Sequence, residues 1–171
     1  TDNDRYLHST EVEWKAAMDH QLPAGFPGCA VSSEPVIRTQ NEDLGGLTTF
    51  GVPGRAASFI RAQSDDAVRS ALNDRHSDEP LLVLGGGSNM LLHADWPGLV
   101  VHVDVRGMHV ISDDGRCVEV VVGAGEPWHD WVMRTVEEGW RGLENLALIP
   151  GRVGAAPMQN IGAYGVEIKD R

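Results

Sequence analysis

Three glycines followed by two small polar residues form the first stretch of the sequence that could do chemistry. The stretch is LGGGSN, Leu84–Asn89, and it ends the apolar run Leu81–Leu84. Glycines after a strand expose several backbone N–H groups in a concavity that suits phosphate oxygens. Ser88 and Asn89 add side-chain hydrogen-bonding groups. The pattern therefore favours either an anion-binding loop or a plain tight turn, and both interpretations stay open on these residues alone.

The loop matches none of the common nucleotide-binding or hydrolase fingerprints. Both GxGxxG and GxSxG would need glycine at position 90, where Met90 stands. The later GAGEPW, which starts at Gly123, also lacks the last glycine, and GxxxxGK[ST] does not occur in the sequence. Phosphate binding remains a hypothesis, whereas the Rossmann, P-loop and nucleophile-elbow interpretations are not supported.

The second candidate stretch is PGRVGAAPMQNIGAYG, residues 150–165. It holds four glycines, two prolines and a single charged residue, Arg152. Uncharged, glycine-rich backbone with a few polar groups is typical of the wall of a site for a large, flat, partly polar ligand. Gln159, Asn160 and Tyr164 would supply those polar groups. A buried irregular segment is the alternative, but its backbone would need hydrogen-bond partners.

Histidine and cysteine indicate no metal site. The seven histidines show no HExxH or similar spacing, and Cys29 and Cys117 form no CxxC pair, so we expect two reduced thiols. His102 is predicted to point outward from a strand, and His129 lies in the first turn of a predicted helix. We interpret both histidines as structural or solvent-facing rather than catalytic.

Strands that alternate with helices are predicted to position the two stretches. Strands are expected at 81–84, 99–105 and 117–125, with 81–84 buried, and residues 56–62 form a short apolar run. One helix should begin after Ser64 as its N-cap, with an apolar face of Val68, Ala71 and Leu72. A second should run from Pro127 to Gly139, with a core face of Trp128, Trp131, Val132 and Val136. A short helix is also expected at 10–20, where Thr10 and Glu13 form a capping box.

Composition indicates an ordinary globular protein that does not bind nucleic acid. The chain has 171 residues and a net charge of −11, and no basic patch is visible. It has no run of about 18 apolar residues and no signal peptide at its start, so we expect a cytoplasmic protein without a membrane span. Residues 1–46 are expected to be an N-terminal extension, partly irregular because of its prolines and glycines.

Four segments together resemble UDP-N-acetylenolpyruvoylglucosamine reductase, a flavoprotein family of peptidoglycan synthesis. They are TTFGVPG (48–54), LVLGGGSNMLL (82–92), VVGAGEPWHDWV (121–132) and GLENLALIPGRVGAAPMQNIGAYGVE (142–167). The segments follow the order found in that family. The resemblance covers about residues 47–171, and the 26-residue final segment (142–167) is its most specific part.

The resemblance implies an α+β fold, the FAD-binding domain of the vanillyl-alcohol-oxidase (PCMH) type, with two small α/β lobes and FAD between them. Residues 47–171 would form this domain, incomplete at its C-terminal end and without the family's substrate domain. The first loop would bind the FAD diphosphate through backbone N–H groups, and the second stretch would line the isoalloxazine ring. The expected cofactor contacts are Gly85, Gly86, Gly87, Ser88, Asn89, Met90, Gly151, Gly154, Ala155, Asn160, Gly162, Ala163 and Tyr164.

The resemblance also implies a reaction that this chain alone would not perform. In the family, NADPH reduces FAD, and the flavin passes hydride to the enolpyruvyl double bond of a UDP-sugar. The family's catalytic arginine, serine and glutamate would all fall beyond Arg171, so no catalytic residue is assigned here. Thr48, Ala155 and Ala156 depart from the family pattern, and the alanines remove possible hydrogen bonds to flavin. We further expect Gly87→Val to block FAD by filling the space of the diphosphate.

Two alternatives remain beside this interpretation. One is a different flavin oxidase of the same fold, which would often tether flavin through a histidine. Residues 150–165 contain no histidine, and this weighs against such an enzyme. The other is a non-catalytic nucleotide- or flavin-binding module.

Overall fold

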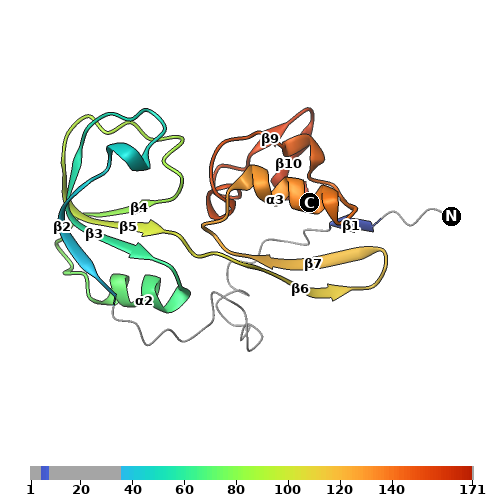
Figure 1. Cartoon of the computed structure of the whole chain (residues 1–171), viewed down its shortest axis with the longest axis horizontal. Coiled ribbons are helices and arrows are strands. Elements are labelled where there is room, and N and C mark those ends of the chain that lie inside the picture. Colours follow the sequence, from blue (N-terminus) through green and yellow to red (C-terminus); the bar gives the residue numbers. More distant parts are fainter. Residues whose placement is uncertain (1–4, 8–35, 171) are drawn as a thin grey trace.

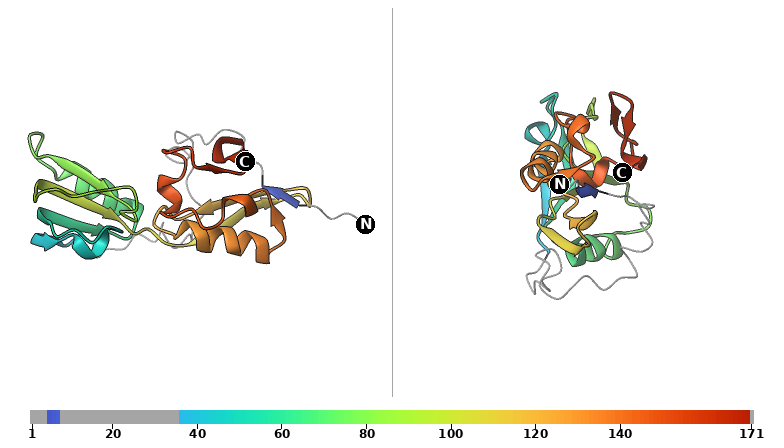
Figure 2. Two further views of the ribbon diagram at one scale, coloured as in Figure 1. Left: turned by 90° about the horizontal axis from the view of Figure 1, so that it is seen from above. Right: turned by 90° about the vertical axis from the view of Figure 1, so that its right-hand side faces the viewer.

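Two small lobes lie side by side along the longest axis of the molecule, each built on a β-sheet with one helix (Figures 1 and 2). The structure is a computed structural model that describes residues 5–7 and 36–170. We call residues 36–103 the first lobe, and residues 108–170 together with strand β1 (Arg5–Leu7) the second lobe. Residues 104–107 connect the two lobes. The helix expected at 10–20 lies outside the described residues.

The first lobe is a four-stranded sheet whose central strands are buried. Its order is β2 (Arg38–Asp43), β3 (Arg55–Ala62), β5 (Trp96–Val103) and β4 (Leu81–Leu84). β2 is antiparallel to β3, whereas β3 and β4 both run parallel to β5. Leu99, Val100 and Val101 of β5 are almost fully buried, as expected for a parallel strand with neighbours on both sides.

Helix α2 (Asp65–Asn73) begins where its N-cap predicts. The Ser64 hydroxyl oxygen accepts a hydrogen bond from the Ala67 amide at 3.1 Å, which satisfies one free N–H group of the first turn. Ala71 is buried in a core with β3 and β5, and Val68 packs at the edge of that core. Leu72 is 43% exposed, so its predicted place on the apolar face is wrong. The helix contacts the sheet along a narrower face than the sequence suggested.

The second lobe contains a sheet of order β6 (Met108–Asp113), β7 (Cys117–Val122), β1 and β8 (Trp140–Arg141). β6 and β7 are antiparallel, and β1 runs parallel to both β7 and β8. Helix α3 (Trp128–Glu137) buries Trp128, Trp131, Val132 and Thr135, and Gly139 follows it with a φ of +75°. Val136 is 47% exposed, so its predicted place on the core face is wrong, and the buried Thr135 lies on that face instead.

A two-stranded hairpin completes the second lobe. It consists of β9 (Gly162–Ala163) and β10 (Val166–Glu167), with Tyr164 and Gly165 between them at φ values of +53° and +80°. Positive φ at both central residues is the geometry of the tightest β-hairpin turns. The other regular backbone of the described residues is four short 3-10 helices: η2 (Gly45–Leu47), η3 (Glu144–Leu146), η4 (Val153–Ala155) and η5 (Ile168–Asp170).

Several strand predictions change in detail. The strand at 81–84 is present, but it is an edge strand with Val83 57% exposed rather than a buried one. The strands expected at 99–105 and 117–125 end at 103 and 122. β2 and β6 were not predicted. β2 and the fully buried Leu44 belong to the first lobe, so the sheet starts before the boundary expected after residue 46.

Candidate functional site

The glycine loop 85–89 leaves the C-terminal end of β4 and turns sharply at Gly87. Gly87 has a φ of +61°, and a Cβ atom there would lie 2.2 Å from the Leu47 carbonyl oxygen and 2.8 Å from the Thr48 Cα. The Thr49 amide donates to the Gly87 carbonyl at 3.1 Å. A side chain at position 87 would therefore collide with residues 47–48. This corrects the expectation that it would fill the space of a bound diphosphate.

The amide groups of this loop have few partners within the molecule. Among the described residues, none of the hydrogen bonds outside regular elements uses the N–H of Gly86, Gly87, Ser88 or Asn89 as a donor. Successive N–H groups without an acceptor are the feature that makes a turn bind an anion. Met90 differs from its neighbours, because its side chain packs against the core of the first lobe. Met90 is only partly buried there, so its backbone and the exposed part of its side chain both remain accessible.

The start of the second stretch is docked on the loop that leads into α3. Gly151 accepts a hydrogen bond from the Trp128 amide at 3.1 Å, Val153 donates to Glu126 at 2.9 Å, and Gly154 donates to Ala124 at 2.9 Å. A Cβ atom at Gly154 would lie only 2.6 Å from the Ala124 Cβ. Glycine at position 154 therefore lets its backbone approach the backbone of Ala124 closely. The close neighbour of this glycine is thus another part of the chain.

The two glycine-rich stretches meet where the lobes face each other. The Cβ position at Gly86 lies 3.5 Å from the Gly151 Cα and 3.3 Å from the Arg152 Cγ, and that at Gly151 lies 3.4 Å from the Ser88 hydroxyl oxygen. These residues are far apart in the sequence and come from different lobes. Their contact brings part of the predicted site together directly.

The rest of the second stretch passes through turns into the β9–β10 hairpin, and Asn160, two residues before β9, bonds to the far side of that hairpin. Asn160 donates to the Glu167 carboxylate at 2.7 Å, and its side-chain oxygen accepts from the Lys169 amide at 3.4 Å. Tyr164 is 90% exposed at the turn. Among the described residues, no hydrogen bond joins Asn160–Tyr164 to the glycine loop 85–89. The structure thus does not join Asn160, Gly162, Ala163 and Tyr164 to the first loop.

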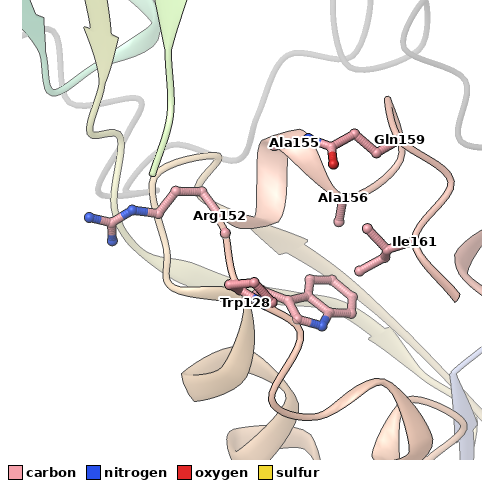
Figure 3. A pocket seen from close by; sticks show the side chains of 8 residues that line it. Trp128, Arg152, Ala155, Ala156, Gln159 and Ile161 are labelled. Atoms are coloured by element: carbon pink, nitrogen blue, oxygen red, sulfur yellow. The ribbon is translucent and has the colours of Figure 1, made fainter. Parts of the chain in front are cut away.

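A small pocket opens beside the docked segment (Figure 3). Ala155 is part of its wall, as is the buried Trp128, whose indole N–H donates to the Leu146 carbonyl at 2.7 Å. The polar end of the indole is therefore already used. The side chains of Ala156, Gln159 and Ile161 lie on the same side of the pocket, whereas the Arg152 guanidinium points away from them (Figure 3). The lining residues are Trp128, Pro150, Gly151, Arg152, Ala155, Ala156, Gln159 and Ile161.

A charged cluster that the sequence did not reveal ties the connector between the lobes to the loop before α3. The buried Asp104 accepts hydrogen bonds from Arg61 at 2.8 Å and from Arg106 at 2.7 Å. Burial alone would raise the pKa of Asp104, but the two arginines offset this and hold it below its ordinary value. Glu126 accepts from the Gly107 amide at 2.8 Å and lies 3.4 Å from Arg106. An acidic residue at the end of an apolar strand was the available sequence signal.

His102 is buried beside the first glycine loop, so the outward orientation predicted for it is wrong. Only 6% of the surface of His102 is exposed, and its ring centre lies 6.1 Å from that of Phe59. Burial lowers its pKa, with the Arg61 and Arg152 charges acting in the same direction, and this outweighs the opposite effects of Asp104 and a hydrogen bond to the Gly85 backbone. The neutral ring therefore fits this environment better than the charged one.

Metal ligation and membrane insertion find no support in the described part of the chain. No group of three or more His, Cys, Asp or Glu residues there is arranged to bind a metal ion. No helix among those residues is long and apolar enough to cross a membrane. Cys117 is a free, half-buried thiol, and Cys29 lies outside the described residues.

The fold and this site define a flavin-binding class of protein. Residues 56–171 match the model of the FAD binding domain family, which is more than half of the chain, and the chain belongs to that family. The unused amide groups of the glycine loop are suited to the diphosphate of its cofactor, FAD.

Two curated relatives of the chain carry the name of one flavoprotein family. The chain is 62% identical over 125 residues to UDP-N-acetylenolpyruvoylglucosamine reductase of Pseudomonas fluorescens, which covers 72% of the chain and 37% of that protein. It is 50% identical over 142 residues to the protein of the same name from Azoarcus, covering 80% of the chain and 41% of that protein. The chain thus spans well under half the length of these curated relatives.

A solved structure supports the fold assignment. The crystal structure of UDP-N-acetylenolpyruvylglucosamine reductase from Thermus caldophilus matches with a TM-score of 0.57 and 28% identity, covering 80% of this chain and 46% of that one. Together with the family match, this confirms the expected α+β fold of the PCMH type and the resemblance on which it was based.

Proposed function

We propose that this chain is the FAD-binding part of an NADPH-dependent reductase that converts UDP-N-acetylglucosamine enolpyruvate to UDP-N-acetylmuramate. The observation that carries the proposal is the 62% identity, over 125 residues, to a UDP-N-acetylenolpyruvoylglucosamine reductase. The contact of Gly86 with Gly151 supports it, because it creates one surface from two lobes for a cofactor to lie against. The product is a precursor of peptidoglycan.

We propose that the N–H groups of Gly85–Asn89, with the Met90 backbone beside them, bind the FAD diphosphate. Gly151, Gly154 and Ala155 would lie along the flavin ring, where the absence of bulky side chains permits close approach. We do not extend this contact to Asn160, Gly162, Ala163 and Tyr164, because Asn160 bonds to Glu167 and Lys169 and Tyr164 is exposed at the hairpin turn. FAD supplies the hydride chemistry when bound, and the proposed contact residues bind and orient it.

The remaining parts of the reaction would belong to a longer protein. NADPH and the UDP-sugar are its proposed reductant and substrate, and the proton donor and enolate-stabilising residues would lie outside this chain. Its FAD-binding domain would start before the boundary expected after residue 46, because β2 and Leu44 belong to the first lobe and β1 pairs with β7 and β8. We place the reaction in the cytoplasm, because both small molecules are cytoplasmic nucleotides.

Flavin titration of the purified chain tests the binding claim. We expect one FAD per chain by absorbance and by quenching of flavin fluorescence. A folded chain that binds no flavin at high FAD concentration would contradict the proposal.

The reaction is tested with the product of the whole reading frame. We expect it to oxidise NADPH only when the enolpyruvyl UDP-sugar is present, with the 171-residue chain as the inactive control. NADPH oxidation that does not depend on this substrate would favour a different flavin oxidase of the same fold. FAD binding without any turnover by the whole protein would favour a non-catalytic module.

A further inference from the structure

Arg152 carries a positive charge that no carboxylate of the described residues neutralises. Its guanidinium donates one hydrogen bond, from Nη1 to the Gly125 carbonyl at 2.9 Å. Other arginines of the same region are engaged with acids: Arg61 and Arg106 pair with Asp104, and Arg106 also approaches Glu126. A guanidinium has five N–H donors, so most of those of Arg152 remain available.

The side chain of Arg152 runs along the backbone of the glycine loop. Its Cγ lies 3.8 Å from the Cβ position at Gly85 and 3.3 Å from that at Gly86. The loop beyond these glycines holds the amide groups that lack acceptors in the described residues. The aliphatic part of the Arg152 side chain therefore lies against the loop that carries the free N–H groups, and its guanidinium points away from the pocket of Figure 3.

The charge balance of the protein makes this cation consequential. The chain carries a net charge of −11, which repels an anionic ligand at long range. Amide dipoles offset this only locally. A guanidinium presents a planar pair of donors that fits phosphate oxygens and cannot lose its charge at ordinary pH.

We propose that Arg152 is a diphosphate-binding residue, which donates from its guanidinium to a phosphate group held by the Gly86–Asn89 amides. The proposal rests on the proposed FAD function and adds to it the one charged contact of the site. The competing explanation is a structural role, in which the hydrogen bond to Gly125 ties the second stretch to the loop before α3. Under the first explanation the loss of Arg152 weakens binding only of a ligand that has phosphates, whereas under the second it weakens binding of any flavin equally.

The test compares FAD with riboflavin, which has the same ring system but no phosphate. Arg152→Gln removes the charge and keeps a donor that can reach Gly125. We expect it to weaken FAD binding by about tenfold or more, the size of one charge-assisted hydrogen bond, and to leave riboflavin binding within about twofold. Arg134→Gln is the matched control, because Arg134 pairs with Glu138 on the exposed surface of α3. The control should bind both ligands as the unmodified chain does.

Competition with pyrophosphate gives a second test of the same proposal. Inorganic pyrophosphate should compete with FAD in the unmodified chain, and it should compete about tenfold less well in Arg152→Gln. Equal losses of FAD and riboflavin in Arg152→Gln, or no loss of either, would overturn the proposal. Pyrophosphate that competes equally well with FAD in both proteins would also overturn it. An unmodified chain that binds no FAD at all would instead refute the proposed function.

Discussion

The glycine loop 85–89 and the β9–β10 hairpin look alike in the sequence and differ in the structure. Both are rich in glycine and poor in charge. In the loop, the amides of Gly86–Asn89 have no acceptor in the described part of the chain, and Gly87 is pressed against Leu47. In the hairpin, Asn160 bonds to Glu167 and Lys169, and a Cβ atom at Gly165 would meet nothing within 4 Å.

The difference separates two uses of glycine. In the loop, glycine permits close backbone approach and leaves donors free for a ligand. In the hairpin, glycine supplies a positive φ for a turn whose polar groups are satisfied internally. We therefore expect changes in the loop and in its docking partner to affect FAD binding, and changes at the hairpin turn to affect stability alone.

The largest effect is expected from Gly87→Val. The new side chain would combine an unfavourable positive φ with a Cβ atom 2.2 Å from a carbonyl oxygen, so we expect a loss of at least about 2 kcal/mol in stability and no FAD binding. Urea unfolding and flavin titration measure the two. Gly46→Val is the control, since its Cβ would meet nothing within 4 Å and its φ is not positive. A folded Gly87→Val chain with normal FAD affinity would show that the loop is not the site.

Gly154→Ala should have the next largest effect. The added methyl group would lie 2.6 Å from the Ala124 Cβ and push the docked segment away from the loop before α3, at a cost of about 1–3 kcal/mol. Because the same segment carries Gly151 and Arg152 to the glycine loop, FAD affinity should fall together with the thermal midpoint. Unchanged FAD affinity at a temperature where the variant is folded would show that FAD binding does not depend on the docking of this segment.

Gly165→Ala should cost about 1 kcal/mol of stability through its φ of +80° and leave FAD affinity unchanged. The same two measurements apply as for Gly154→Ala. This variant sharpens the comparison, because weaker FAD binding here would mean that the hairpin turn takes part in the site. The distinction between the two glycine-rich regions would then be wrong.

The smallest effect concerns pH and the buried His102. Its pKa is lowered in the folded chain, so below about pH 6.5 the unfolded chain binds a proton that the folded chain resists. The stability contributed by the neutral ring is present above pH 6.5 and is lost as pH falls toward the folded-state pKa. His102→Gln should therefore lose less stability between pH 7.5 and 5.5 than the unmodified chain, as measured by urea unfolding. Identical losses in both proteins would contradict this assignment.

Local signals in the sequence predicted much of the framework. The Ser64 cap located the start of α2, Gly139 located the end of α3, and the strand at 81–84 has the predicted bounds. These features depend on hydrogen bonds and φ values within a few residues. β2, with the sequence RTQNED, has almost no apolar pattern and forms because β3 offers it a free edge. No pattern within the sequence of β2 itself indicates that β3 will pair with it.

Burial of single side chains was predicted less well for the same reason. Leu72, Val136 and His102 each continue the pattern of their own element, yet the neighbouring element decides which of them is covered. Asp104 is a further case, because its two arginine partners come from separate elements, one in β3 and one in the connector between the lobes.

The sequence by itself determined that two glycine-rich stretches exist, that they resemble those of a flavoprotein family, and which short elements flank them. These properties follow from residue type and local spacing. Only the tertiary structure decided that Gly86 and Ser88 meet Gly151, that Gly87 lies against Leu47, and that Asn160 is used within the hairpin. Glycine has no side chain to indicate its neighbour, so its role depends on which backbone the fold brings beside it.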